Sequence, residues 1–184
     1  MAATGDEEHV SEAPAAGQDQ GPALLALYDR AVPQVYGYLL PRCGSVVAAE
    51  DLTAETFLAA VTAVQRRAVP ELTVAWLVGV ARHKLVDHFR RQGREERKLR
   101  QVHEPDAEPE DPWDTHIDAV RARAVLADLG AHHRAALTLR YLDGLPVTEV
   151  AQHLDRTEHA TEALLVRARA AFRVRYGERS DDDA

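Results

Sequence analysis

The chain has 184 residues, enough for one compact domain or two small ones, and its hydrophobic content of 46% is that of a globular protein. A single cysteine, Cys43, excludes an internal disulfide framework and a cysteine-rich zinc site. No stretch approaches the roughly 20 apolar residues of a membrane-spanning helix. The acidic N-terminus lacks the basic cluster and apolar core of a signal peptide. We therefore expect a cytoplasmic protein without membrane insertion.

The formal net charge of −8 argues against a simple nucleic-acid-binding protein, for which a basic domain is usual. The charges are unevenly distributed, however. Acidic residues concentrate in the N-terminal tail, at 104–118 and at 181–183, whereas basic residues concentrate at 82–100 and 167–175. Two basic segments separated by acidic connectors are typical of a protein with two DNA contacts, although solvated helix faces would give the same pattern.

Helical periodicity in the N-terminal half predicts one small domain after a disordered tail at residues 1–21. Its three helices are expected at about 23–42, 47–67 and 73–91. Pro33 should kink or restart the first helix, and Thr73 is a suitable N-cap for the third. Together they predict a first domain over residues 22–92.

Helical-wheel positions predict which side chains of these helices face the core. For the second helix they are Leu52, Phe57, Leu58, Val61 and Val64. For the third helix they are Val74, Leu77, Val78, Ala81, Leu85 and Phe89.

The opposite side of the third helix carries Trp76, His83, Asp87 and Arg90. An aromatic ring beside basic and polar groups suits single-stranded or melting DNA, because rings stack on unpaired bases and cations hold phosphates. Packing of Trp76 on a neighbouring helix, and pairing of Asp87 with Arg90 or Arg91, are the alternative interpretations.

Residues 93–116 are charged and contain three prolines, which predicts a flexible acidic linker. Helical periodicity then returns in four segments, at about 117–129, 132–142, 146–154 and 157–176. These form a second domain over residues 117–177, followed by an acidic tail at 178–184. Because no segment alternates like a strand, the predicted fold class is all-α, with two small helical domains.

The segment from Pro146 to Phe172 has the proportions of a helix-turn-helix unit, a short helix followed by a long arginine-bearing one. The long helix should bury Leu164, Leu165, Ala168 and Phe172. Its other side carries His159, Glu162 and Ala163, which we expect to read base edges, near Val166. The arginines that would hold phosphates are Arg167, Arg169 and Arg173. An ordinary surface of a helical bundle is the alternative interpretation.

Four short motifs follow one another along the chain. They are Leu27-Tyr28-Asp29-Arg30, Ala49-Glu50-Asp51-Leu52-Thr53-Ala54-Glu55-Thr56-Phe57, Trp76-Leu77 with Ala81-Arg82, and Val166-Arg167-Ala168-Arg169. In this order, across a proline-rich linker, they resemble the extracytoplasmic-function (ECF) group of sigma-70-type alternative sigma factors. The resemblance covers about Leu24 to Tyr176, and it implies a subunit that directs RNA polymerase to promoters.

The resemblance implies three binding surfaces. Contacts with the β′ clamp helices of core RNA polymerase would come from Asp51, Leu52, Glu55 and Phe57. Contacts with the minus-10 promoter element would come from Trp76, Arg82, His83, Asp87, Arg90 and Arg91. Contacts with the minus-35 element would come from His159, Glu162, Ala163, Val166, Arg167, Arg169 and Arg173.

The implied partners are core RNA polymerase, through its β′ clamp helices and β flap, promoter DNA, and an anti-sigma factor. The resemblance implies no catalytic residue, metal or cofactor, so we expect a protein that is not an enzyme. Its expected location is the cytoplasm, on the nucleoid when bound to polymerase.

Five positions depart from the family pattern. Glu162 and Leu164 stand where basic residues are frequent early in the recognition helix. Ala54 replaces a common glutamine, and His83 replaces the usual asparagine of the minus-10 segment. Asp155 replaces the common glycine of the helix-turn-helix turn, where aspartate tolerates a left-handed backbone better than most residues.

Two other functions are compatible with parts of the sequence. A stand-alone helix-turn-helix regulator shares the C-terminal motif but does not account for the acidic 51–57 segment. A helical metal-dependent hydrolase is suggested by nine histidines, with His83 and Asp87 one helical turn apart, but His88 points away from His83. Cys43 could be a redox sensor or a small buried residue.

Overall fold

The computed structural model describes residues 20–69, 71–99 and 118–181, and within these ranges the regular structure is entirely helical. The elements are α1 (Gly21–Cys43), α2 (Val46–Gln65), α3 (Val74–Leu99), α4 (Ala119–Asp128), α5 (Ala131–Leu137), the π-helical segment η1 (Thr138–Leu142), α6 (Val147–Leu154) and α7 (Glu158–Asp181). The all-α prediction is confirmed. The tail through residue 19, the linker over 100–116 and residues 182–184 lie outside the described residues. None of the described helices is long and apolar enough to cross a bilayer.

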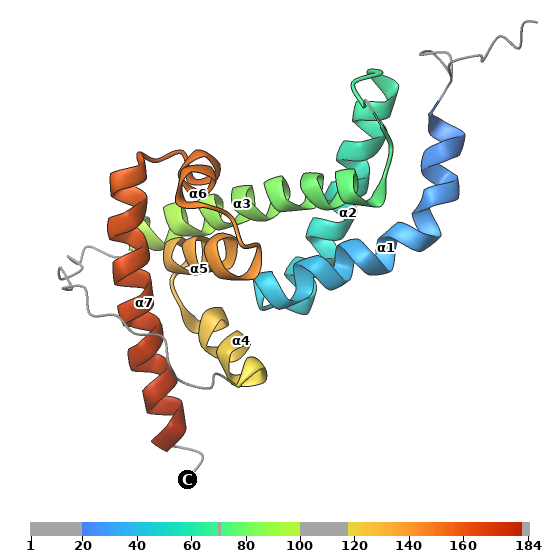
Figure 1. Ribbon diagram of the computed structural model, residues 1–184. Coiled ribbons are helices and arrows are strands. Elements are labelled where there is room, and N and C mark those ends of the chain that lie inside the picture. Colours follow the sequence, from blue (N-terminus) through green and yellow to red (C-terminus); the bar gives the residue numbers. More distant parts are fainter. Residues whose placement is uncertain (1–19, 70, 100–117, 182–184) are drawn as a thin grey trace, which may run out of the picture.

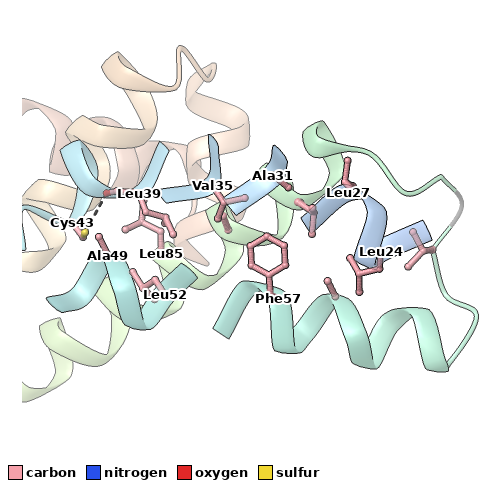
Figure 2. Packing of buried hydrophobic residues seen from close by; sticks show 14 of the residues in the cluster. Leu24, Leu27, Ala31, Val35, Leu39, Cys43, Ala49, Leu52, Phe57 and Leu85 are labelled. Carbon is pink, nitrogen blue, oxygen red and sulfur yellow. Dashed lines mark hydrogen bonds between the residues drawn. The ribbon is translucent and has the colours of Figure 1, made fainter. Parts of the chain in front are cut away.

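Helices α1, α2 and α3 pack against one another to form the first domain (Figure 1). Figure 2 shows side chains of α1 and α2 meeting in its core, with Leu85 of α3 among them. Each fully buried leucine stabilises the fold by about 1.5–3 kcal/mol. Cys43 belongs to this core, is 2% exposed and donates to the carbonyl of Leu39, so it packs as a small buried residue.

Local signals set most helix ends as the sequence predicts. The Thr73 hydroxyl accepts from the amide of Trp76 at 3.1 Å, which confirms it as the N-cap of α3. Ser45 caps α2 in the same way, after Gly44 ends α1 with a left-handed φ of 69°. Pro33 lies inside α1, and the helix bends along its length without restarting (Figure 1).

The predicted core face of α2 is partly wrong, because Leu58 is 68% exposed and Val61 is 42% exposed. Thr53 and Thr56 are buried instead. Each threonine hydroxyl donates to the carbonyl one turn earlier at 2.7 Å, so burial leaves no unsatisfied polar group. A hydrophobic pattern that counts threonine as polar places the buried face of α2 on the wrong residues.

Helix α3 continues through Leu99, past the predicted start of the linker at residue 93. The extension is held by the second domain. A Glu96 carboxylate oxygen accepts from the amide of Ala131 at 3.1 Å, and Arg97 Nη2 lies 2.7 Å from His132 Nε2. Gly93 allows this approach, because a Cβ there would lie 2.4 Å from the His132 ring. These contacts are tertiary, so the boundary could not be read from local periodicity.

Helices α4 to α7 form the second domain around a separate core. Helices α6 and α7 are the predicted helix-turn-helix unit, and their turn contains Asp155 with φ 54° and ψ 52°. This confirms that aspartate takes the left-handed position that glycine often holds. The predicted buried side chains of α7 are also confirmed, with at most 5% exposure at Leu164, Leu165, Ala168 and Phe172.

The two domains pack against each other along α3 (Figure 1). The first part of α3 lies in the core of the first domain, and its later part contacts α5 and α6 of the second. A small apolar cluster of its own lines the junction, made by Val86, Leu139, Leu145 and Val150. The sequence predicts two domains joined by a linker, but it does not predict this contact between them.

Candidate nucleic-acid interface

The outward face of α7 presents the side chains predicted to contact duplex DNA. His159, Glu162 and Arg173 are exposed, and the flanking predicted residues are half-buried, namely Ala163, Val166, Arg167 and Arg169. They lie opposite the four buried apolar residues of the same helix. The helix therefore offers an exposed face on which five polar or charged side chains flank the apolar Ala163 and Val166, a composition that suits entry into a major groove.

The start of α7 is held rigidly by its own threonines. The Thr157 hydroxyl accepts from the amide of Ala160 at 3.2 Å, and its carbonyl accepts from the buried Thr161 hydroxyl at 2.9 Å. The N-terminal turn that carries His159 is thus fixed on the α6–α7 turn. A fixed helix start is what direct reading of base edges requires.

The residues predicted for the minus-10 element lie along α3, but they do not form one open surface. Arg91 pairs with Glu55 of α2 at 3.6 Å, and Arg90 lies 3.9 Å from Asp87. Trp76 is half-buried against the first-domain core, as the packing interpretation expected. His83 and Asp87 are exposed.

Asp143 of the second domain reaches the first domain and binds Arg82. Its carboxylate accepts from Arg42 Nε at 2.8 Å, from the Tyr38 hydroxyl at 2.9 Å and from Arg82 Nε at 3.1 Å. We name these four residues the Asp143 clasp. The Asp143 side chain is only 1% exposed. Burial, and then the Asp143 charge, raise the pKa of Tyr38 to about 12, so its hydroxyl stays protonated as a donor.

The π-helical segment η1 delivers Asp143 to this position. The wide turn is closed by a bond from the Asp143 amide to the carbonyl of Thr138 at 3.0 Å. Gly144 follows with a left-handed φ of 68°. The sequence predicts only that a helix ends near residue 142, and nothing local marks Asp143 as an interdomain ligand.

Two further contacts cover the same side of α3. Arg90 Nη2 donates to the backbone carbonyl of His153, and the rings of His83 and His153 lie 5.3 Å apart between centroids. Burial, followed by the nearby charges of His83 and Arg82, lowers the pKa of His153. The second domain thus holds or adjoins three of the predicted minus-10 residues.

A pocket of about 410 Å³ lies between the domains further along α3. It is lined by what we name the arginine cluster, consisting of Arg90, Arg94, Arg97 and Arg156. Burial, and then the charges of Arg97 and Arg167, lower the pKa of Arg156. Burial and the charges of Arg97 and Arg156 similarly lower the pKa of His132. The domains therefore bring like charges together at this end of their contact.

The residues predicted to bind core polymerase are divided between surface and core. Asp51 is exposed, and Glu55 is partly exposed while pairing with Lys84 and Arg91, each at 3.6 Å. Leu52 and Phe57 are 1% and 8% exposed, so both hold α2 in the first-domain core. The exposed apolar side chains on α2, which sequence analysis placed inside, are Leu58 and Val61.

The described residues contain no group of three histidine, cysteine or carboxylate side chains that could hold a metal ion. In particular, His83 is near His153 in space, and Asp87 is near Arg90. The hydrolase alternative therefore finds no support in this part of the chain.

Known proteins match both domains. Residues 27–95 match the family described as Sigma-70 region 2, and residues 120–172 match Sigma-70, region 4. The ECF RNA polymerase sigma factor SigC of Mycobacterium tuberculosis is 33% identical over 155 residues, which cover 81% of this chain and 80% of SigC. The ECF sigma factor BldN of Streptomyces coelicolor is 33% identical over 156 residues, covering 79% of this chain and 57% of BldN.

A solved structure shares the fold. The sigma factor RpoE of Bartonella quintana, crystallised with the anti-sigma factor NepR, aligns with a TM-score of 0.50 and 19% identity. The alignment covers 84% of this chain and 96% of that one. With both sigma regions matched in order, and most of SigC covered at this identity, the chain belongs to the ECF group of the sigma-70 family of RNA polymerase sigma factors.

Proposed function

We propose that this sigma factor binds core RNA polymerase and directs it to promoters, reading the minus-35 element with α7 and the minus-10 element with α3. The observation that carries the proposal is the α7 face, where a rigid helix start exposes His159 and Glu162 ahead of three arginines. The family membership supports the same assignment. No step in this function requires a catalytic residue or cofactor, and we expect none.

The division of labour on α7 follows from charge and position. Glu162 can accept from cytosine N4, and Ala163 can contact a thymine methyl, which would supply sequence specificity. Arg167, Arg169 and Arg173 would hold phosphates and supply affinity that depends on salt. Glu162 would be repelled by the DNA backbone, so it must face base edges and not phosphates.

The outer face of α2 is the proposed contact with the β′ clamp helices. Its exposed Asp51 and partly exposed Glu55 supply charge, while Leu58 and Val61 supply apolar area. An apolar centre with a charged rim is the usual composition of a stable protein interface. Leu52 and Phe57 would act through α2, by keeping that face in place. The second domain would contact the β flap, and we expect an anti-sigma factor to regulate the free protein in the cytoplasm.

Run-off transcription with core polymerase from the same organism tests this function. Wild-type protein should produce promoter-specific transcripts, and Asp51→Arg should abolish them because it reverses a charge on the proposed polymerase contact. Glu178→Arg is the matched control, since it makes the same charge change at an exposed position near the end of α7. Duplex binding without transcripts or core association would instead identify a stand-alone regulator.

A further inference from the structure

The pocket of about 410 Å³ that holds the arginine cluster combines positive charge with an apolar lining. The apolar side chains come from four helices and are Phe89, Ala135, Leu154 and Leu164. We propose that this pocket binds an oligophosphate, a chain of two or more linked phosphate groups. Of the arginine cluster, only Arg90 is shared with the proposed promoter contacts. The site therefore goes beyond the proposed function and does not depend on it.

The backbone places the four arginines around one space. Arg90, Arg94 and Arg97 are three and four residues apart, so α3 presents them as a row on one side. Arg156 lies across the pocket from this row, in the turn between α6 and α7. Among the described residues that line the pocket, Asp155 is the one carboxylate, and it is exposed. Four arginines and one aspartate leave the pocket with a net positive charge.

Two arginines of the cluster have no counter-charge within the described ranges. Elsewhere on α3, Arg82 pairs with the buried carboxylate of Asp143. In the part of the chain that the structure describes, the guanidinium groups of Arg94 and Arg156 make no ion pair. Burial, and then the charges of nearby arginines, lower the pKa of Arg156. An anion in the pocket would supply the missing counter-charge and favour the charged form of this side chain.

The pocket also holds donors that are suited to phosphate oxygens. Arg90 Nε is buried and has no hydrogen-bond partner among the described residues. Guanidinium groups can bind phosphate through two parallel, charge-assisted hydrogen bonds. At 1.5 Å per residue, the row from Arg90 to Arg97 is about 10 Å long, which exceeds the span of one phosphate group. A chain of phosphates can therefore meet several arginines at once, whereas orthophosphate cannot.

The shape of the site favours a small anion over a DNA duplex. The arginine cluster lines a pocket between two domains, whereas a duplex is usually read by an open helix face like that of α7. Its volume lies within the range of about 300–1,000 Å³ that is usual for small-molecule sites. The apolar lining could also take the nucleoside part of a nucleotide, so inorganic oligophosphates and nucleotides share the required chemistry.

Isothermal titration calorimetry of the full-length protein with inorganic triphosphate, without magnesium, tests the site. We expect one saturable site with at least about tenfold higher affinity for triphosphate than for orthophosphate or sulfate at equal ionic strength. Arg156→Gln should weaken triphosphate binding by at least about tenfold. Arg123→Gln is the matched control, because Arg123 is an exposed arginine of the same domain outside this pocket. Equal affinities for the three anions, or equal effects of the two variants, would overturn the site.

Thermal unfolding separates loss of the site from loss of the fold. Without added anion, Arg156→Gln should melt at or above the wild-type temperature, because it removes repulsion between like charges. With triphosphate at 100 times its dissociation constant, the wild-type melting temperature should rise by about 5–10 °C. The variant should show a smaller rise, and Arg94→Gln should behave in the same way. Variants that melt below wild type without anion would show that these arginines stabilise the fold, which would contradict an uncompensated cluster.

Adenosine triphosphate distinguishes the two sources of the phosphate chain. An affinity equal to that of inorganic triphosphate would assign binding to the phosphates alone, and a higher affinity would add the nucleoside on the apolar lining. Failure of both ligands to bind would overturn the proposal. Run-off transcription remains a separate measurement, so a failure of the oligophosphate site and a failure of the proposed sigma-factor function are distinguishable.

Discussion

Helices α3 and α7 are both amphipathic, arginine-bearing helices proposed to bind DNA, but their polar faces differ in exposure. The polar face of α7 is open, with His159, Glu162 and Arg173 exposed. The polar face of α3 is partly covered, with Arg82 bound to Asp143 and Arg90 bound to the His153 carbonyl. A helix with a DNA-binding pattern can therefore use its hydrogen-bond donors in contacts within the chain. Only tertiary contacts show which helix does so.

The largest effect, on the free energy of unfolding, should come from a substitution on the buried side of α3. Phe89 is 1% exposed in the first-domain core, and the guanidinium of Arg134 from α5 lies 6.0 Å from its ring centre. We expect Phe89→Ala to lower the free energy of unfolding by about 3–5 kcal/mol, because it opens a cavity where both domains meet. Urea denaturation measures this. Asp87→Ala is the control on the outer side of the same helix, where 59% exposure predicts a change within about 0.5 kcal/mol.

An intermediate effect, on the pH dependence of stability, should come from the Tyr38 hydroxyl, which lies at the covered face of α3. Burial and Asp143 raise its pKa from 10.0 to about 12, so folding favours the protonated form. This stabilisation is fully present below pH 10 and is lost as the pH rises through 12, with a total of about 2–3 kcal/mol. The measurement is the difference in unfolding free energy between wild type and Tyr38→Phe across that range. A difference that stays constant with pH would contradict the raised pKa of Tyr38.

The smallest effect, on the salt dependence of DNA affinity, should come from a substitution on the exposed face of α7. Arg173→Gln removes one proposed phosphate contact, so it should reduce the slope of log affinity against log salt by about 1 without changing promoter preference. Holoenzyme binding to promoter duplex at several salt concentrations measures the slope. Arg175→Gln is a matched control on the same helix, because Arg175 donates to the carbonyl of Asp128 and serves a structural contact. Equal slopes for both variants would show that Arg173 does not contact phosphate.

Local physics explains which predictions held. Helical periodicity identified the α7 buried face, since apolar side chains three and four residues apart must share a side. Thr73 and Asp155 were assigned from cap and turn chemistry that acts within a few residues. The errors occurred where a polar side chain could satisfy itself inside the core, as Thr53 and Thr56 do. A binary hydrophobic pattern does not encode that option.

The sequence by itself determined the all-helical class, the two domains, the helix-turn-helix unit and the family resemblance, because these depend on short-range spacing and on motif order. Tertiary structure alone decided that α3 extends to Leu99, that α2 exposes Leu58, and that Asp143 joins Tyr38, Arg42 and Arg82. In the sequence, Tyr38 and Arg42 lie 105 and 101 residues from Asp143, and Arg82 lies 61 residues from it. No local signal specifies these contacts, because they depend on how the two domains pack together.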